Sequence, residues 1–147
     1  MKRRGVVTEV SSTVRRPGLT SVHVKRLVAA TLGSERISNA TISVAFVGRT
    51  TISRLNRKYL RHEGATDVIS FGMGRSARGM PAVGDIYICP DVARVNARTN
   101  GIPAREELSR LVIHGTLHVA GYEHPDDDSR TKSKMWKRQE RILASAC

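Results

Sequence analysis

The sequence predicts an α+β fold, in which a single domain is built on one mixed β-sheet packed with helices. Segments typical of strands and helices interleave along the chain without the strict alternation of a parallel α/β protein. A length of 147 residues suits one domain with a substantial hydrophobic core, and no internal repeat divides it. We therefore expect one domain over residues 1–147, whose first 18 residues are an N-terminal extension or an edge strand.

The first half of the chain is expected to alternate strands with helices. Thr20 or Ser21 can cap a helix that has an apolar inner face and that Gly33 ends. Apolar and polar residues alternate over 41–47, which predicts a strand with one buried face. The full expected order is an edge strand at 6–10, a helix from 20 or 21 to about 32, a strand at 41–47, a helix at about 51–60 and a strand at 67–71.

The second half begins with a loop over 72–82 that is rich in glycine and arginine. Its Arg75 and Arg78 are candidate contacts for phosphate, and thus candidate substrate-binding residues. Pro103 suits the first position of a helix, and the two glutamates that follow are favourable near its positive end. The remaining expected elements are a strand at 83–89, a short helix from 90 that ends at 101, the helix from 103 and a last helix at about 129–144.

Histidines gather in one segment of the helix that starts near residue 103. His114, His118 and His124 are three of the five histidines and fall within eleven residues. On a helix, His114 and His118 share one face, roughly 6 Å apart along the axis. Gly121 can end that helix in a left-handed conformation and bring His124 back toward the other two rings. Such a tripod on a central helix and the following turn suits one Zn²⁺ per chain, with a fourth position open.

Histidine pairs at this spacing can also be hydrogen-bonded partners in a core without any metal. Three histidines buried together would, however, be costly to satisfy in that way. The spacing also matches the metzincin protease pattern H-E-x-x-H-x-x-G-x-x-H, except that Gly115 replaces the glutamate that acts as general base. This replacement argues against peptide hydrolysis, for which Glu123 is the only nearby substitute base.

Charge is the outlying property of the composition. The chain has 25 basic and 13 acidic residues, a formal net charge of +12 and a sequence pI near 10.8. Such an excess favours a polyanionic partner, most plausibly a nucleic acid, although a solvated basic surface is the alternative. With six aromatic residues, base stacking cannot be the main binding device, so phosphate contacts should dominate.

Several signals bear on the compartment. The two cysteines, Cys89 and Cys147, form no C-x-x-C pair, which fits a reducing environment. The basic N-terminus is followed by no apolar segment typical of a secretory signal, and no apolar run approaches the length of a membrane span. We therefore expect a cytoplasmic protein with no membrane partner.

Four motifs resemble the YbeY family, described as metal-dependent endoribonucleases that act in ribosomal RNA maturation. The most specific is His-Gly-Thr-Leu-His-Val-Ala-Gly-Tyr-Glu-His at 114–124, which is similar to the family pattern H-G-x-L-H-L-x-G-Y-D-H. The others are Leu-Asn at 55–56, Thr-Asp-Val-Ile-Ser-Phe at 66–71 and Gly-Asp-Ile at 84–86. Their order and spacing extend the resemblance from about residue 20 to the end of the chain.

The resemblance implies a single-strand-specific endoribonuclease, with ribosomal RNA and pre-ribosomal particles as partners and with His114, His118 and His124 as zinc ligands. The family often has an arginine directly after the tyrosine of the second helix, where this chain has Leu60. Arg61 is the neighbouring candidate for a catalytic arginine, but a shift of one residue turns a helical side chain by about 100°. Asp67 and Asp85 could orient a ligand or the attacking group, although turn or capping roles are the favoured explanation of both.

The leading hypothesis is thus zinc-centred hydrolysis of an RNA phosphodiester. The nucleophile is either water activated by the metal or the RNA 2′-hydroxyl, with Arg61 or the loop that carries Arg75 and Arg78 stabilising the developing charge. Two other functions stay open at this point. One is a zinc peptidase, and the other is a non-catalytic assembly factor that binds ribosomal RNA and uses zinc to hold its fold.

Overall fold

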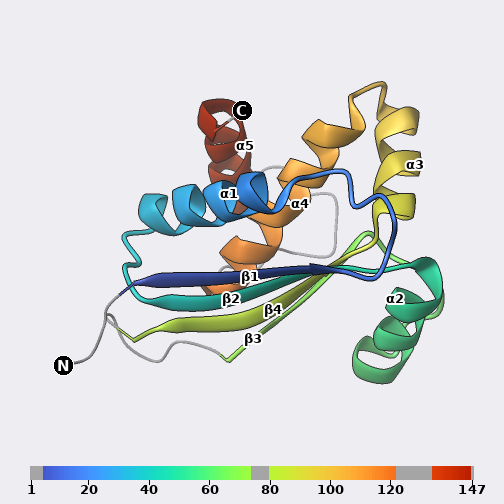
Figure 1. The fold of residues 1–147 in the computed structure, drawn as a ribbon, viewed down its shortest axis with the longest axis horizontal. Coiled ribbons are helices and arrows are strands. Elements are labelled where there is room, and N and C mark those ends of the chain that lie inside the picture. Colours follow the sequence, from blue (N-terminus) through green and yellow to red (C-terminus); the bar gives the residue numbers. More distant parts are fainter. Residues whose placement is uncertain (1–4, 74–79, 122–133, 147) are drawn as a thin grey trace.

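The sheet is the element against which most of the protein packs (Figure 1). The computed structural model describes residues 5–73, 80–121 and 134–146. In those residues four strands form one sheet in the order β1-β2-β4-β3. Strands β1, β2 and β4 are parallel, whereas β3 runs antiparallel to β4, which confirms the predicted mixed sheet of an α+β domain. The strands are β1 (Val6–Ser12), β2 (Ala40–Phe46), β3 (Val68–Gly72) and β4 (Ala82–Ile88).

The helices lie mainly on one face of this sheet. Figure 1 shows α1, α4 and α5 above the strands and α2 beside one end of the opposite face. The helices are α1 (Ser21–Ser34), α2 (Arg49–Leu55), α3 (Pro90–Asn100), α4 (Ala104–Val119) and α5 (Lys134–Ala146), with a π-helical turn η1 (Asn56–Leu60) directly after α2. Among the described residues, no helix has the length and apolar content needed to cross a bilayer.

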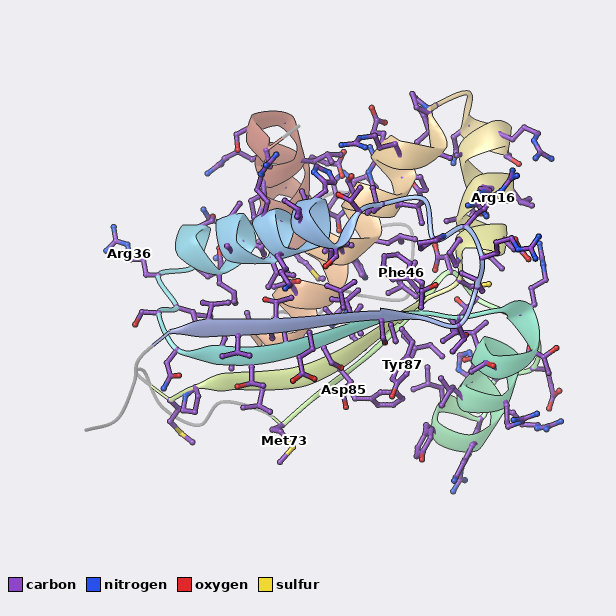
Figure 2. All side chains as sticks on the ribbon, viewed as in Figure 1. Arg16, Arg36, Phe46, Met73, Asp85 and Tyr87 are labelled. Atoms are coloured by element: carbon purple, nitrogen blue, oxygen red, sulfur yellow. The ribbon has the colours of Figure 1, made fainter. Side chains whose placement is uncertain are left out.

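The core lies between the sheet and helices α1, α4 and α5. Alternation along β2 directs Ile42, Val44 and Phe46 toward the helices, where each is at most 1% exposed. Asp85 and Tyr87 of β4 point to the opposite face, as Figure 2 shows. Helix α4 contributes more buried residues than any other described helix, including Leu108, Val112, Ile113 and Leu117. Burial of each such side chain stabilises the fold by roughly 1.5–3 kcal/mol. The histidine helix is therefore held rigidly.

Most predicted boundaries agree with the structure to within a few residues. The Thr20 hydroxyl accepts a hydrogen bond from the backbone N–H of His23 at 3.1 Å, so Thr20 is the N-cap of α1. Gly33 does not end α1, since the helix continues to Ser34.

The prediction of one regular helix over 51–60 was wrong for the second half of this segment, which forms the π-helical turn η1. A π-helical turn holds one more residue than an α-helical turn and rotates the side chains that follow it. Asn56 is consequently buried and donates a hydrogen bond to the Gly64 carbonyl at 3.0 Å, whereas Tyr59 is 54% exposed. In a regular helix, the spacing of Ile52 and Tyr59 would put both on one face.

Candidate active site

Two of the three predicted ligands come together on α4. The ring centroids of His114 and His118 are 4.9 Å apart, with the ring planes at 71°, and both side chains are partly buried. This is the arrangement that their spacing predicted. His124 lies outside the described residues, and no group of three potential metal ligands occurs within them. The assignment of the three histidines as ligands therefore stays a prediction.

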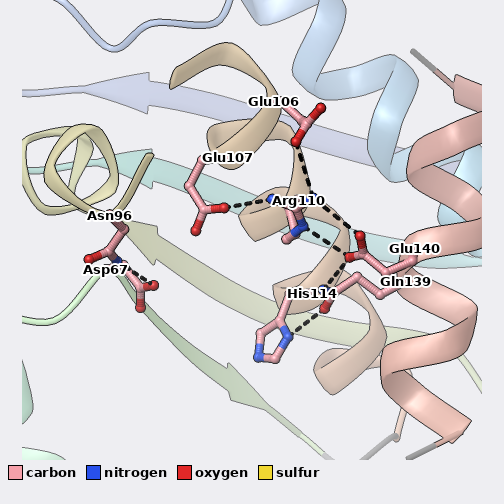
Figure 3. A network of polar contacts seen from close by, with 8 residues as sticks. All are labelled: Asp67, Asn96, Glu106, Glu107, Arg110, His114, Gln139 and Glu140. Carbon is pink, nitrogen blue, oxygen red and sulfur yellow. Dashed lines mark hydrogen bonds and ion pairs between the residues drawn. The ribbon is translucent and has the colours of Figure 1, made fainter. Parts of the chain in front are cut away.

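A glutamine on α5 orients the first of these rings (Figure 3). The Gln139 amide nitrogen donates to a carboxylate oxygen of Glu140 at 3.0 Å, which directs its oxygen, Oε1, toward His114. The distance from that Oε1 to Nδ1 of His114 is 2.7 Å. Because an amide oxygen only accepts hydrogen bonds, Nδ1 must carry the proton, and Nε2 is the nitrogen that can bind a metal. Gln139 is 1% exposed, so water does not compete for this contact.

Arg110 ties the start of α4 to α5 through three carboxylates. Its guanidinium donates to Glu140 at 2.9 Å, to Glu107 at 2.7 Å and to Glu106 at 3.3 Å. Burial tends to lower the pKa of Arg110. The hydrogen bonds to Glu140 and Glu107 together have the larger effect, so the pKa of Arg110 is raised above its usual value. The same Glu140 holds the Gln139 amide. Arg110, Glu140 and Gln139 thus form a continuous support for the ring of His114.

A cavity of about 460 Å³ opens beside His114. Residues of β3, α3, α4 and α5 surround it, and the conformation of its polar wall is fixed by hydrogen bonds. Asn96 donates through Nδ2 to Asp67 at 3.3 Å, and Asp67 is one of the two aspartates that the sequence singled out. The cavity is lined by Asp67, Val68, Asn96, Asn100, Ile102, Glu107, Arg110, Leu111, His114, Trp136 and Gln139.

Two other residues that the sequence singled out, Asp85 and Arg61, do not line this cavity. Asp85 accepts a hydrogen bond from the Ser43 hydroxyl at 2.6 Å, on the sheet face opposite α4. Arg61 is exposed, follows η1 with φ of 57°, and is not among the residues that line the cavity. Arg75 and Arg78 fall outside the described residues. Of the predicted aspartates, only Asp67 thus shares a cavity with a motif histidine.

Gly115 faces the sheet at a point of close approach between α4 and β4. A Cβ atom at this position would lie 2.7 Å from Cγ2 of Ile86, nearer than two carbon atoms can come. The backbone needs a glycine here for packing. A glutamate at this position, as in the metzincin pattern, would direct its first side-chain atom into Ile86.

Sequence reasoning missed the residues that support the site. Gln139 and Arg110 were not predicted, because their roles depend on the packing of α4 against α5. The signal that could have found Arg110 is local: Glu106 and Glu107 precede it by four and three residues, the spacing of helical ion pairs. No comparable local signal marks Gln139, which lies 25 residues from its partner.

Comparison with known proteins agrees with the resemblance seen in the sequence. The family model described as "Endoribonuclease YbeY" matches residues 12–146. A relative of that name from Chlorobium luteolum is 35% identical over 136 residues, covering 92% of this chain and 94% of the relative. Another from Staphylococcus carnosus is 39% identical over 111 residues, covering 71% of each. The match to a relative from Frankia alni, at 37% identity, spans 63% of that relative's length.

A solved structure supports the fold. The solution structure of TM1509 from Thermotoga maritima is similar with a TM-score of 0.64 and 26% sequence identity. The similarity covers 95% of this chain and 89% of the other. The predicted α+β architecture is thus shared with an experimentally determined protein.

Proposed function

Because the chain belongs to the YbeY family, we propose that it is a zinc-dependent, single-strand-specific endoribonuclease that acts in ribosomal RNA processing and ribosome maturation. The observation that carries the proposal is the His114–His118 pair, together with the hydrogen bond that Nδ1–H of His114 donates to Gln139. The proposed substrate is ribosomal RNA, free or in pre-ribosomal particles, and the proposed location is the cytoplasm.

The donor chemistry of the site fits zinc. Two imidazoles lie on one helical face, and the hydrogen bond at Nδ1 of His114 fixes the tautomer that presents Nε2. His124 would be the third ligand, as the motif implies. When bound there, one zinc ion per chain would supply Lewis-acid chemistry toward the scissile phosphodiester.

The residue next to the first motif histidine bears on which substrate the site can hydrolyse. No carboxylate side chain follows the first motif histidine, because Gly115 packs on Ile86. This disfavours peptide hydrolysis by the metzincin route. For RNA, either the 2′-hydroxyl or water attacks the phosphorus, and the products tell the two apart. Attack by the 2′-hydroxyl leaves a 2′,3′-cyclic phosphate, whereas attack by water leaves a linear phosphate end.

The charge distribution supports an RNA substrate. The chain carries a net charge of +12, and three exposed arginines of α2 and η1 stand close together. Arg49, Arg54 and Arg57 line a hollow of about 370 Å³. Glu63 lines the same hollow, but none of the three arginines forms an ion pair with another described residue, so their positive charges can attract phosphate. Further proposed phosphate contacts are Arg61, Arg75 and Arg78.

The test is cleavage of a single-stranded RNA together with zinc analysis of the purified protein. Wild type should cleave the RNA and hold about one zinc per chain, and His118→Ala should lose both properties. His62→Ala is the matched control, because His62 is exposed and outside the motif. If wild type holds zinc and binds RNA without cleaving it, the proposed nuclease is wrong and the non-catalytic assembly factor is favoured.

A further inference from the structure

The cavity beside His114 extends from the predicted metal site toward the start of α4. Glu107, Leu111 and His114 lie on one stripe of the helix and line the cavity. His118 continues the same stripe but is not part of the lining. Glu107 and His114 are seven residues apart, roughly 10 Å along the helix axis. The cavity therefore occupies the space adjacent to the histidine pair, not the space between the two rings.

The polar wall of this cavity is rich in hydrogen-bond acceptors. Glu107 accepts from Arg110 through Oε1, and Figure 3 shows its other oxygen directed away from Arg110. Asn96 uses its amide nitrogen on Asp67, so its amide oxygen is the atom that remains to accept. Three acceptor-bearing side chains thus stand on two sides of the cavity.

The charge of this wall is opposite to that of the protein as a whole. Arg110 is surrounded by three carboxylates, and Asp67 adds a fourth on the other side of the cavity. Of these carboxylates only Glu107 and Asp67 line the cavity, and their two negative charges exceed the single positive charge of Arg110 by one. This excess of negative charge favours a neutral group with N–H donors over a phosphate inside the cavity.

The remaining lining suits a flat, largely apolar body. Leu111, Ile102 and Val68 provide aliphatic surface, and Trp136 provides an aromatic ring. A nucleobase combines these properties, since it stacks on aromatic rings and carries polar groups along one edge. The volume of about 460 Å³ is enough for a base with its ribose.

We propose that this cavity binds the nucleobase next to the cleaved phosphate and that it prefers guanine. Guanine presents two adjacent donors, N1–H and the N2 amino group, which a carboxylate can accept together. Uracil would instead bring carbonyl oxygens toward Glu107 and Asp67, where acceptors face acceptors. The position of the phosphate rests on the proposed nuclease function, but the preference for guanine rests on the cavity alone.

Binding of short single-stranded RNAs tests the proposal. Seven-nucleotide uridine oligomers carrying one central guanosine, adenosine, cytidine or uridine would be titrated against the full chain. Trp136 is the only tryptophan, so its fluorescence reports on occupancy of this cavity. We expect the guanosine oligomer to bind roughly tenfold more tightly than the all-uridine oligomer and to change the emission of Trp136.

Matched variants separate the cavity from the ion-pair network. Glu107→Gln and Asp67→Asn should each abolish the preference for guanosine. Glu106→Gln also removes one carboxylate from Arg110, but Glu106 does not line the cavity, and the preference should remain. Urea unfolding of each variant would show that the folded state is retained.

The outcomes distinguish this inference from the proposed function. Equal affinity for the four oligomers, or an unchanged Trp136 emission, would overturn the guanine site even if the RNA is cleaved. Equal effects of Glu106→Gln and Glu107→Gln would also overturn it. A guanosine preference without cleavage of any RNA would instead retain the guanine site and contradict the nuclease.

Discussion

The Oε1 atom of Gln139 lies 2.7 Å from Nδ1 of His114, so a residue of α5 decides which nitrogen of the first motif histidine can bind a metal. Gln139 is in turn held by Glu140, and Glu140 by Arg110 of α4. Loss of a hydrogen bond that orients a metal ligand typically lowers metal affinity by roughly 10–100-fold. The link between α4 and α5 is therefore part of the candidate metal site.

Replacement of Gln139 tests this link. Gln139→Leu keeps the approximate volume but leaves the Nδ1–H group of His114 without its acceptor. We expect zinc affinity to fall by roughly 10–100-fold, as measured by competition with a coloured chelator. Arg141→Ala, on an exposed position of the same helix, is the control and should leave zinc affinity unchanged. An unaltered zinc affinity in Gln139→Leu would refute the orienting role.

The arginines of α2 and η1 should govern the salt dependence of RNA binding. Arg54→Ala combined with Arg57→Ala should weaken binding to all RNA sequences alike, because phosphate contacts carry no sequence information. The slope of log affinity against log salt should decrease by roughly one to two. Arg36→Ala is the control, because Figure 2 shows Arg36 at the far end of the molecule from α2. A slope equal to that of wild type would mean that RNA binds elsewhere.

Stability should depend on pH through His23. Burial, followed by the charges of Arg105 and Arg26, lowers the pKa of His23 from 6.5. His23 Nδ1 is also buried without a hydrogen-bond partner among the described residues. The unfolded chain therefore binds a proton more readily than the folded chain. His23 should contribute stability above about pH 6.5 that is lost as the pH falls toward its lower folded value.

A neutral substitute at this position isolates that contribution. His23→Gln cannot be protonated and can still hydrogen-bond the Ser109 hydroxyl, which His23 contacts at 3.3 Å. The free energy of unfolding in urea should decrease less between about pH 7.5 and 5.5 in this variant than in wild type. Identical pH dependence in the two proteins would show that His23 is not the titrating group.

The features that the sequence could predict are those with local causes. The Thr20 cap, the helical spacing of His114 and His118, and the alternation over β2 each depend on neighbouring residues. The strand order, in which β4 lies between β2 and β3, depends on contacts distant in sequence and left no local trace. The same is true of the cavity beside His114, which residues of four elements create together.

The π-helical turn shows where local periodicity fails. Tyr59 has helical spacing relative to the buried Ile52, but it belongs to the π-helical turn η1 and is exposed. The buried Asn56 and its bond to Gly64 favour the wider turn, since they satisfy a polar group that a regular helix would have placed elsewhere. Arg61 follows this turn with a left-handed backbone, so no helical register relates it to the family's arginine.

The last prediction concerns Gly115, where packing and chemistry give different expectations. From the sequence, Gly115→Glu should impair RNA cleavage, because it adds negative charge where a phosphate must approach and crowds a buried helix. The contact with Ile86 makes crowding the stronger of these effects, because even a methyl group would lie 2.7 Å from Cγ2 of Ile86. Gly115→Ala, which adds no charge, should therefore already lower the free energy of unfolding by roughly 1–3 kcal/mol.

Gly33→Ala is a matched control, because Gly33 is also helical but has no atom within 4 Å of the added methyl group. The free energy of unfolding of that variant should increase by roughly 0.5–1 kcal/mol, because the entropy of its unfolded chain is lower.

A double variant tests the contact with Ile86 directly. When Gly115→Ala and Ile86→Ala are combined, the decrease in the free energy of unfolding should be smaller than the sum of the two single decreases, since the second change creates room for the first. Urea unfolding measures all of these values, and zinc-dependent cleavage of casein should be undetectable in wild type. If Gly115→Ala were as stable as wild type, packing would not require a glycine at this position. Peptidase activity in wild type that His118→Ala abolishes would show that the site is a protease.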